Sequence, residues 1–236
     1  MYVGLYKPFG FAWFEFLTAN TNANDLDGQY WNGTSWVPLV DFIDRTKGFT
    51  RSNKIQWDRE QDDWTELSID GVTNYWVRFK PSADHDNTTE IAGIGIVFSN
   101  DDELKEEVSQ ILKYLPSGKT SFIQYHQSVV KDIVRQVNNR GNKKFTSHNQ
   151  GYESIDKFDF LDPEEIADAA KWFALEKIYF QISDNTEDKY YQRYLDYKGF
   201  ASNAFDLYYL TLDRNDDGKK SVSEKNKIER VRVRVL

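Results

Sequence analysis

No cysteine occurs among the 236 residues of this chain. Disulfide bonds, thiol nucleophiles and cysteine-ligated zinc sites all need that sulfur, so all three are excluded. The absence of cysteine also suits assembly in a reducing compartment.

Residues and motifs of known active sites are scarce. The chain has three histidines, His85, His126 and His148, and no HExxH, GxSxG, P-loop or GxGxxG pattern. His126 falls inside a helical pattern, where we interpret it as an ordinary packed or surface histidine. Adjacent carboxylates such as Glu106 and Glu107 are common, but adjacency does not supply the opposed geometry of a glycosidase. We therefore predict that the protein is not an enzyme.

Long apolar runs and an excess of cations are missing too. No uninterrupted apolar stretch approaches the roughly 18 residues of a spanning helix. The opening MYVGLYKPFGFAWFEFL has no basic region and no small-residue cleavage site, so we interpret it as a strand rather than a signal peptide. The 30 Lys and Arg against 38 Asp and Glu give a net charge of −8, which argues against general binding to duplex DNA.

Aromatic residues, in contrast, are abundant and unevenly placed. They make up 16% of the chain, and hydrophobic residues 39%, which is too much for a disordered protein. Six of the seven tryptophans lie before Ser99, among short alternating runs, whereas helical spacing begins after Ser99. We predict an α+β protein with two domains, residues 1–98 and 99–236.

Three segments indicate strands in the first domain. The Asn32-Gly33 pair in QYWNGTSW supplies the two positive-φ residues of a type I′ hairpin turn. Residues 75–80 alternate, with Tyr75, Val77 and Phe79 on one face and Trp76, Arg78 and Lys80 on the other, and we expect one face to be buried. Residues 91–98 indicate a mostly buried strand. Several strands at such short spacing predict an antiparallel β-sandwich.

The tryptophans of this domain allow two interpretations. Exposed indoles stack on sugar rings, so a Trp-rich sandwich can bind carbohydrate. Tryptophan in a small sandwich more often fills the core or braces a hairpin, and we favour that interpretation. Asp84-His85-Asp86 has metal-capable side chains, but the polar residues beside it favour a solvated turn.

Four helices are predicted in the second domain. The first has Asn100 as its cap and an apolar stripe that continues to Leu115. The second runs from about Ser121 to Asn139, the third opens at Asp162, and the fourth carries regularly spaced tyrosines. The defining residues are Leu104, Val108, Ile111, Leu112 and Leu115; Phe122, Tyr125, Val129, Ile133 and Val137, with Gly141 as the stop; Pro163 and Glu165; and Tyr190, Tyr194, Tyr197, Ala201, Ala204 and Tyr208. The third is apolar nearly all round from Trp172 to Ile182, which places it at the centre of a four-helix bundle.

An acidic loop follows the fourth helix and matches a calcium-binding pattern. The ligands would be oxygens of Asp213, Asn215, Asp217 and Glu224 with the Lys219 carbonyl, while Gly218 makes the sharp turn. Lys220 departs from the pattern, because an apolar residue is usual there. A solvated acidic turn without Ca²⁺ is the alternative, and both interpretations stay open.

The last segment alternates strictly between arginine and valine. Arg230, Arg232 and Arg234 share one face of an extended strand, and Val231, Val233 and Val235 share the other. Such a strand needs a partner edge, which is either the protein's own sheet or a neighbouring subunit. We predict that residues 225–236 form a partner-binding tail.

The second domain resembles the head-to-tail connector (adaptor) proteins of tailed bacteriophages. The likeness lies in the helix order and in the segments LKEEVSQILKYLP and LDPEE and the Trp172-to-Ile182 helix. The first domain resembles β-sandwich domains of phage virion proteins through WNGTSW and DRTKGFT. Compact adaptors lack so large an N-terminal domain. The protein is therefore either a connector with an added outer domain or another component of the phage neck, and both interpretations stay open.

The resemblance implies a structural protein of the virion neck, assembled in the host cytoplasm. It implies a ring, usually a dodecamer, that binds the portal protein through its C-terminal extension and joins it to head-completion or tail proteins. DNA would pass through the ring without sequence-specific binding. A carbohydrate-binding or adhesin-like protein that uses the Trp-rich sandwich is the alternative, and a glycoside hydrolase is a remote third.

Overall fold

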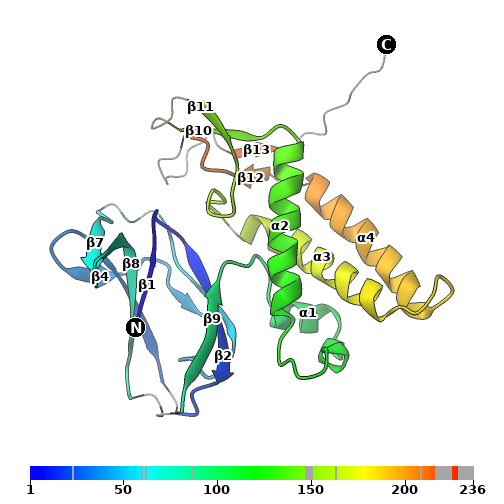
Figure 1. The fold of residues 1–236 in the computed structure, drawn as a ribbon, viewed down its shortest axis with the longest axis horizontal. Helices are drawn as coiled ribbons and strands as arrows, with labels where there is room; N and C mark the ends of the chain where they lie inside the picture. The colour runs from blue at the N-terminus through cyan, green and yellow to red at the C-terminus, as the bar shows by residue number, and fades with distance from the viewer. Residues whose placement is uncertain are drawn as a thin grey trace. The chain divides into compact units, whose positions relative to one another are not determined.

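The structure, a computed structural model, describes residues 1–22, 24–59, 61, 63–84, 86, 88–146, 151–162, 164–207, 209–215 and 225–227. It is α+β, with antiparallel sheets, and strands β1 to β9 precede helices α1 to α4 (Figure 1). Contacts divide the chain into Met1–Gly95, here called the front unit, and Ile96–Leu236, the helical unit. The sequence pattern predicts this boundary after residue 98.

Two antiparallel sheets make up the front unit. One has the order β1-β8-β3-β4, with β7 also paired to β8, and the other has the order β5-β6-β2-β9. The strands of the first are β1 Tyr2–Leu5, β8 Val72–Pro81, β3 Leu26–Trp31, β4 Trp36–Pro38 and β7 Glu66–Ile69. Those of the second are β5 Ile43–Asp44, β6 Asn53–Gln56, β2 Phe11–Thr18 and β9 Glu90–Gly95.

Residues of both sheets share one aromatic-rich core. Phe14 of β2 and Phe79 of β8 meet edge to face with ring centroids 5.5 Å apart, a favoured geometry for aromatic pairs. Trp57 packs against the same Phe79 ring and donates its indole N–H to the Phe9 carbonyl at 2.7 Å. Burying large rings from two sheets in one cluster is the main source of stability for a unit of this size.

The predicted hairpin is confirmed, but its turn differs from the prediction. Strands β3 and β4 pair Trp31 with Trp36. Gly33 has a φ of +94°, whereas Asn32 is not among the residues with positive φ, so the turn is not type I′. The Asn32 side chain instead accepts hydrogen bonds from the backbone N–H groups of Thr34 and Ser35. Asparagine therefore works here through its side chain, as in an Asx turn.

Strand β8 confirms the predicted alternation, and β9 corrects the next prediction. Val77 and Phe79 are buried, while Arg78 on the opposite face is partly exposed. Residues 91–98 do not form one buried strand: β9 ends at Gly95, and its Ile94 is 45% exposed. Among the described strands β9 pairs with β2 alone, at the edge of its sheet, so part of it stays exposed.

Helices α1 Asp101–Glu107, α2 Ile123–Asn139, α3 Glu164–Ile182 and α4 Lys189–Leu207 make up most of the helical unit. A 3₁₀ helix, η1 Ile111–Tyr114, follows α1. Strands β10 Lys143–Thr146 and β11 Gly151–Ser154 pair with each other, as do β12 Tyr209–Thr211 and β13 Lys225–Lys227.

Helix α3 is the central element of this unit, as its apolar sequence predicts. It contacts α1, α2, α4 and β12. Its buried residues, among them Ile166, Ala170 and Leu175, point in several directions around the helix. A helix that is covered on several sides needs no polar face, which explains why its apolar residues show no single stripe.

The predicted start of the first helix is confirmed, but its predicted length is not. Asn100 forms a full capping box with Glu103 at the start of α1, as predicted. The predicted stripe to Leu115 is broken, however, because Val108 adopts an extended conformation (φ −130°, ψ 90°). The β-branched Val108 is followed by Ser109, and both have low helix propensity. The chain then resumes as η1, which buries Ile111 and leaves Leu112 38% exposed.

The predicted extents of α2 and α3 agree with the structure. All five predicted stripe residues of α2 are buried, and Gly141 has the positive φ (+81°) of a helix stop. The Asp162 side chain accepts a hydrogen bond from the Glu164 N–H at the start of α3. The Glu165 carboxylate accepts from both the N–H and the hydroxyl of Thr211, which ties α3 to β12. Pro163 and Tyr208 lie outside the described residues.

Candidate functional site

An aromatic seam joins α3 to α4 in the helical unit. The tyrosines of α4 have the predicted spacing, and Tyr197 lies between Trp172 and Tyr179 of α3. Its ring centroid is 5.8 Å from that of Trp172 and 5.3 Å from that of Tyr179. Tyr114 of η1 extends the seam, because its ring contacts those of Tyr179 and Tyr190. Ring-to-ring packing of this kind fixes the separation of the two helices.

A pocket of about 390 Å³ opens beside this seam. It lies between the end of α1, η1, α3 and α4, and both polar and aromatic residues line it. Tyr179 and Tyr197 are 5% and 4% exposed, whereas Glu107 and Arg193 are exposed. The lining residues are Glu107, Val108, Ser109, Gln110, Tyr114, Tyr179, Arg193 and Tyr197.

The tyrosine hydroxyls of the pocket are held in their neutral form. Burial raises the pKa of Tyr179 to about 12, and the phenol of Tyr197 adds to that shift. Burial also raises the pKa of Tyr197, where the Arg193 guanidinium opposes the shift and the Glu107 carboxylate adds to it. A hydrogen bond with Tyr190 raises the pKa of Tyr114. At neutral pH these groups therefore act as hydrogen-bond donors and acceptors without charge.

A second, more open hollow of about 570 Å³ lies between α2 and the end of α3. Gln124, Tyr125 and Ser128 of α2 form one side, and Lys177, Phe180 and Gln181 of α3 form the other. The Tyr125 hydroxyl donates to the Gln181 side chain across it. Phe180 is 59% exposed, with its ring 5.1 Å from that of Tyr194 on α4.

Several large apolar side chains of α3 and α4 remain in contact with solvent. They are Phe180, Leu195 and Phe200, which are 59%, 42% and 50% exposed. We call these three the exposed α3–α4 side chains. A single exposed leucine needs no explanation, but three large apolar side chains on one helical hairpin leave apolar area that burial against another surface would stabilise.

The tryptophans of the front unit follow the interpretation that we favoured. Trp13, Trp57 and Trp64 are buried. Trp31 and Trp36 brace the β3–β4 hairpin with ring centroids 5.7 Å apart. On the same outer face, the Arg78 guanidinium lies 4.8 Å from the Trp36 ring centroid, a cation–π distance, and Tyr2 packs at 5.4 Å from that ring.

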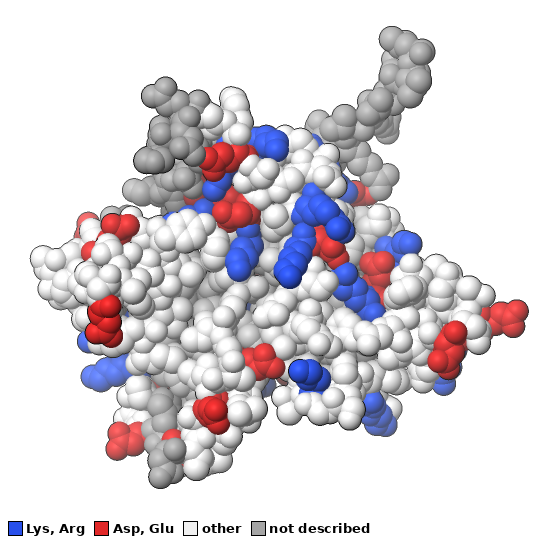
Figure 2. All heavy atoms as spheres, viewed as in Figure 1, with Lys and Arg blue, Asp and Glu red and all other residues white. Residues whose placement is uncertain are grey.

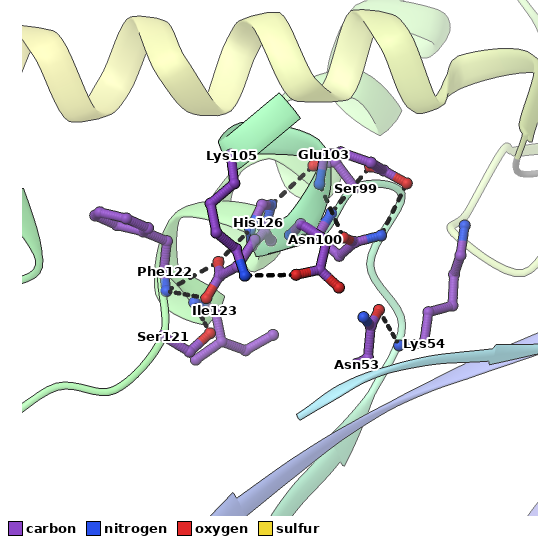
Figure 3. Close-up of polar contacts among 12 residues, drawn as sticks. Asn53, Lys54, Ser99, Asn100, Glu103, Lys105, Ser121, Phe122, Ile123 and His126 are labelled. Carbon is purple, nitrogen blue, oxygen red and sulfur yellow. Dashed lines mark hydrogen bonds and ion pairs between the residues drawn. The ribbon is translucent and has the colours of Figure 1, made fainter. Parts of the chain in front are cut away.

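Ser99, Asp101 and His126, which no local sequence pattern connects, meet at the start of α2; Figure 3 labels Ser99 and His126. His126 is 1% exposed, and its Nδ1 lies 2.8 Å from the Ser99 hydroxyl oxygen. Its Nε2 lies 3.0 Å from the Asp101 carboxylate, which also accepts from the Phe122 N–H. An Nε2–H donated to Asp101 and a hydroxyl donated to Nδ1 satisfy both ring nitrogens.

This trio has the composition of a hydrolase triad but not its arrangement. In a Ser-His-Asp triad the serine contacts Nε2 and is open to substrate. Here Ser99 contacts Nδ1 and is 1% exposed. The trio therefore links the start of α1 to the start of α2. The prediction that His126 is a packed histidine is confirmed. Its partners Ser99 and Asp101 could not be predicted, because they are 27 and 25 positions away in the sequence.

The predicted calcium ligands fall only partly within the described residues. Asp213 is fully buried and its N–H donates to the Asp159 carbonyl at 2.7 Å, while Asn215 is exposed. Asp217, Lys219 and Glu224 lie outside the described residues. Among the described residues, no group of three or more histidine or carboxylate side chains is placed to hold a metal ion.

The predicted partner-binding residues 230–235 also lie outside the described part of the chain. Nearer to α4, Lys225–Lys227 form β13, which pairs antiparallel with β12. The first residues of the predicted tail are thus paired within the chain itself.

Charges of both signs are interspersed over the helical unit in the view of Figure 2. On α2, Asp132 pairs with Arg135 at 2.7 Å and with Lys177 of α3 at 2.6 Å. The face in view therefore shows no continuous basic surface of the kind that duplex DNA requires. None of the helices in the described ranges is both long and apolar enough to cross a membrane.

Comparison with known proteins gives no relative. No family model matches the chain, and neither a curated protein nor a solved structure does.

Proposed function

We propose that the protein is a non-enzymatic component of the neck of a tailed bacteriophage, a ring that joins the portal to tail or head-completion proteins. The front unit would be an outer β-sandwich domain, and helices α1 to α4 a bundle that forms the ring. This proposal rests on the sequence resemblance together with one structural observation, which is the set of exposed α3–α4 side chains.

The exposed α3–α4 side chains support side-by-side assembly. The core of the helical unit is already built from α3 and the buried faces of α2 and α4, so Phe180, Leu195 and Phe200 are not needed to fill it. In a closed ring each subunit presents two different surfaces to its neighbours, and helices with apolar residues on more than one side supply such surfaces. Complete burial of these three side chains would contribute about 0.7–1.5 kcal/mol each, because they are 59%, 42% and 50% exposed in the isolated fold.

The C-terminal tail would hold the ring to the portal. Arg230, Arg232 and Arg234 would face carboxylates or water while the valines between them pack against the partner. Strand addition of this kind satisfies the backbone groups of an otherwise open strand. Removal of residues 229–236 should then weaken binding to the portal and leave the isolated fold nearly unchanged.

The mass of the native assembly tests the proposal most directly. We expect a closed ring, twelve-fold or near it, for the protein at high concentration or in the assembled particle. Phe180→Asp with Leu195→Asp should shift the mass toward the monomer, because charged groups would be buried in the ring contact. Gln127→Asp, on an exposed position of α2, is the matched control and should leave the ring intact. A protein that is monomeric at high concentration and absent as a ring from the particle would exclude this function.

A further inference from the structure

We propose that the tyrosine-lined pocket between α1, η1, α3 and α4 binds a sugar residue. This inference does not depend on the neck assignment. It concerns Glu107, Ser109, Tyr179, Arg193 and Tyr197 of the helical unit, not the tryptophans of the front unit.

The first argument is that two nearly buried tyrosines have accessible hydroxyls that no other described residue bonds. Tyr179 and Tyr197 line the pocket and are 5% and 4% exposed. Neither hydroxyl makes a hydrogen bond to another of the residues that the structure describes. Neither hydroxyl oxygen is among the fully buried atoms without a partner, so both are accessible from the pocket, where water or a ligand can form hydrogen bonds with them.

The second argument is the balance of charge at the pocket mouth. Glu107 only accepts hydrogen bonds and Arg193 only donates them, and neither makes an ion pair with another described residue. The two opposite charges leave the pocket close to neutral. A simple anion would meet Glu107 and a simple cation would meet Arg193, so an uncharged polar ligand suits both.

The third argument is the match of donors and acceptors. Each sugar hydroxyl both donates and accepts, as do the hydroxyls of Tyr179, Tyr197 and Ser109. Adjacent hydroxyls of a pyranose can reach one carboxylate and one guanidinium together. The volume of about 390 Å³ lies in the range of small-molecule sites, and the tyrosine rings supply apolar walls for the C–H faces of a sugar.

Titration of the whole protein with methyl glycosides of glucose, galactose, mannose and N-acetylglucosamine, followed by calorimetry or NMR, tests the proposal. At least one should bind at millimolar concentration. Tyr197→Phe, Glu107→Gln and Arg193→Gln should each weaken that binding about tenfold, because they remove a hydroxyl, a charged carboxylate acceptor and the guanidinium donors respectively. Circular dichroism of each variant shows that the fold is kept.

Two control variants locate the site. Trp36→Ala in the front unit and Lys177→Gln in the other hollow should leave sugar affinity unchanged. The proposal is overturned if none of the four glycosides binds, if Trp36→Ala abolishes binding while the pocket variants do not, or if the pocket variants affect only the binding of a zwitterion such as glycine.

Discussion

The two units place their aromatic side chains in different surroundings. In the front unit Phe14, Trp57 and Phe79 form the centre of one core shared by both sheets. In the helical unit aromatic rings line a seam between α3 and α4, and Phe180 and Phe200 of that region remain at least half exposed. The front unit therefore uses its rings to stabilise itself, whereas part of the apolar surface of α3 and α4 contributes nothing to the isolated fold.

The largest predicted effect tests that difference directly. Phe79→Ala should destabilise the front unit by about 3–5 kcal/mol, because it leaves a cavity among four aromatic rings. Phe200→Ala should destabilise the helical unit by only about 1 kcal/mol, because half of the side chain is exposed and the rest packs on Trp172 and Tyr197. Denaturant unfolding followed by tryptophan fluorescence and by circular dichroism measures both. Equal losses in the two variants would remove the contrast between the units.

A smaller loss is expected where the helical unit depends on polar contacts. Asp101→Ala removes the partner of His126 Nε2 and of the Phe122 N–H, and should cost about 1–3 kcal/mol because buried groups are left unpaired. Glu106→Ala, on an exposed position of the same helix, is the control and should be nearly neutral. If Asp101→Ala is also neutral, water replaces the carboxylate and the trio does not hold α1 to α2.

A third prediction is that alkaline pH lowers the free energy of unfolding of the helical unit through Tyr179 of the aromatic seam. The pKa of Tyr179 is about 12 in the folded protein against an ordinary value of 10.0, so its contribution to stability is complete below pH 10. That contribution is lost as the pH rises from 10 to 12, because the unfolded chain releases the proton first. Wild type should lose more unfolding free energy than Tyr179→Phe over this interval. Parallel pH profiles for the two proteins would contradict this assignment.

The smallest effect concerns calcium. If Asp213, Asn215, Asp217, Lys219 and Glu224 bind one ion, calorimetry should detect heat on addition of millimolar Ca²⁺, and Asp217→Asn should abolish it. The helical unit should then melt at a slightly higher temperature with Ca²⁺, while the front unit should not respond. Absence of heat in the wild type would favour the solvated acidic turn.

The sequence predicted those elements whose pattern is local. The stripe of α2, the Asn100 cap and the alternation in β8 each depend on neighbouring residues, and all three are confirmed. The break at Val108 and the exposure of β9 were missed, because they depend on which partner covers a segment. The same holds for the candidate pocket: Glu107 and Arg193 are 86 positions apart, and no local spacing indicates that they meet.

Strand β8 sets the order of events during synthesis of the front unit. It pairs with β1, β3 and β7, and its Trp76 indole packs over the Gly4 backbone of β1. Strands β1 and β3 emerge from the ribosome before residues 72–81 do. Until then they lack β8, the strand that lies between them in the sheet. Closure of this sheet is therefore a late event, and the aromatic strands made earlier depend on β8 for protection from association with other nascent chains.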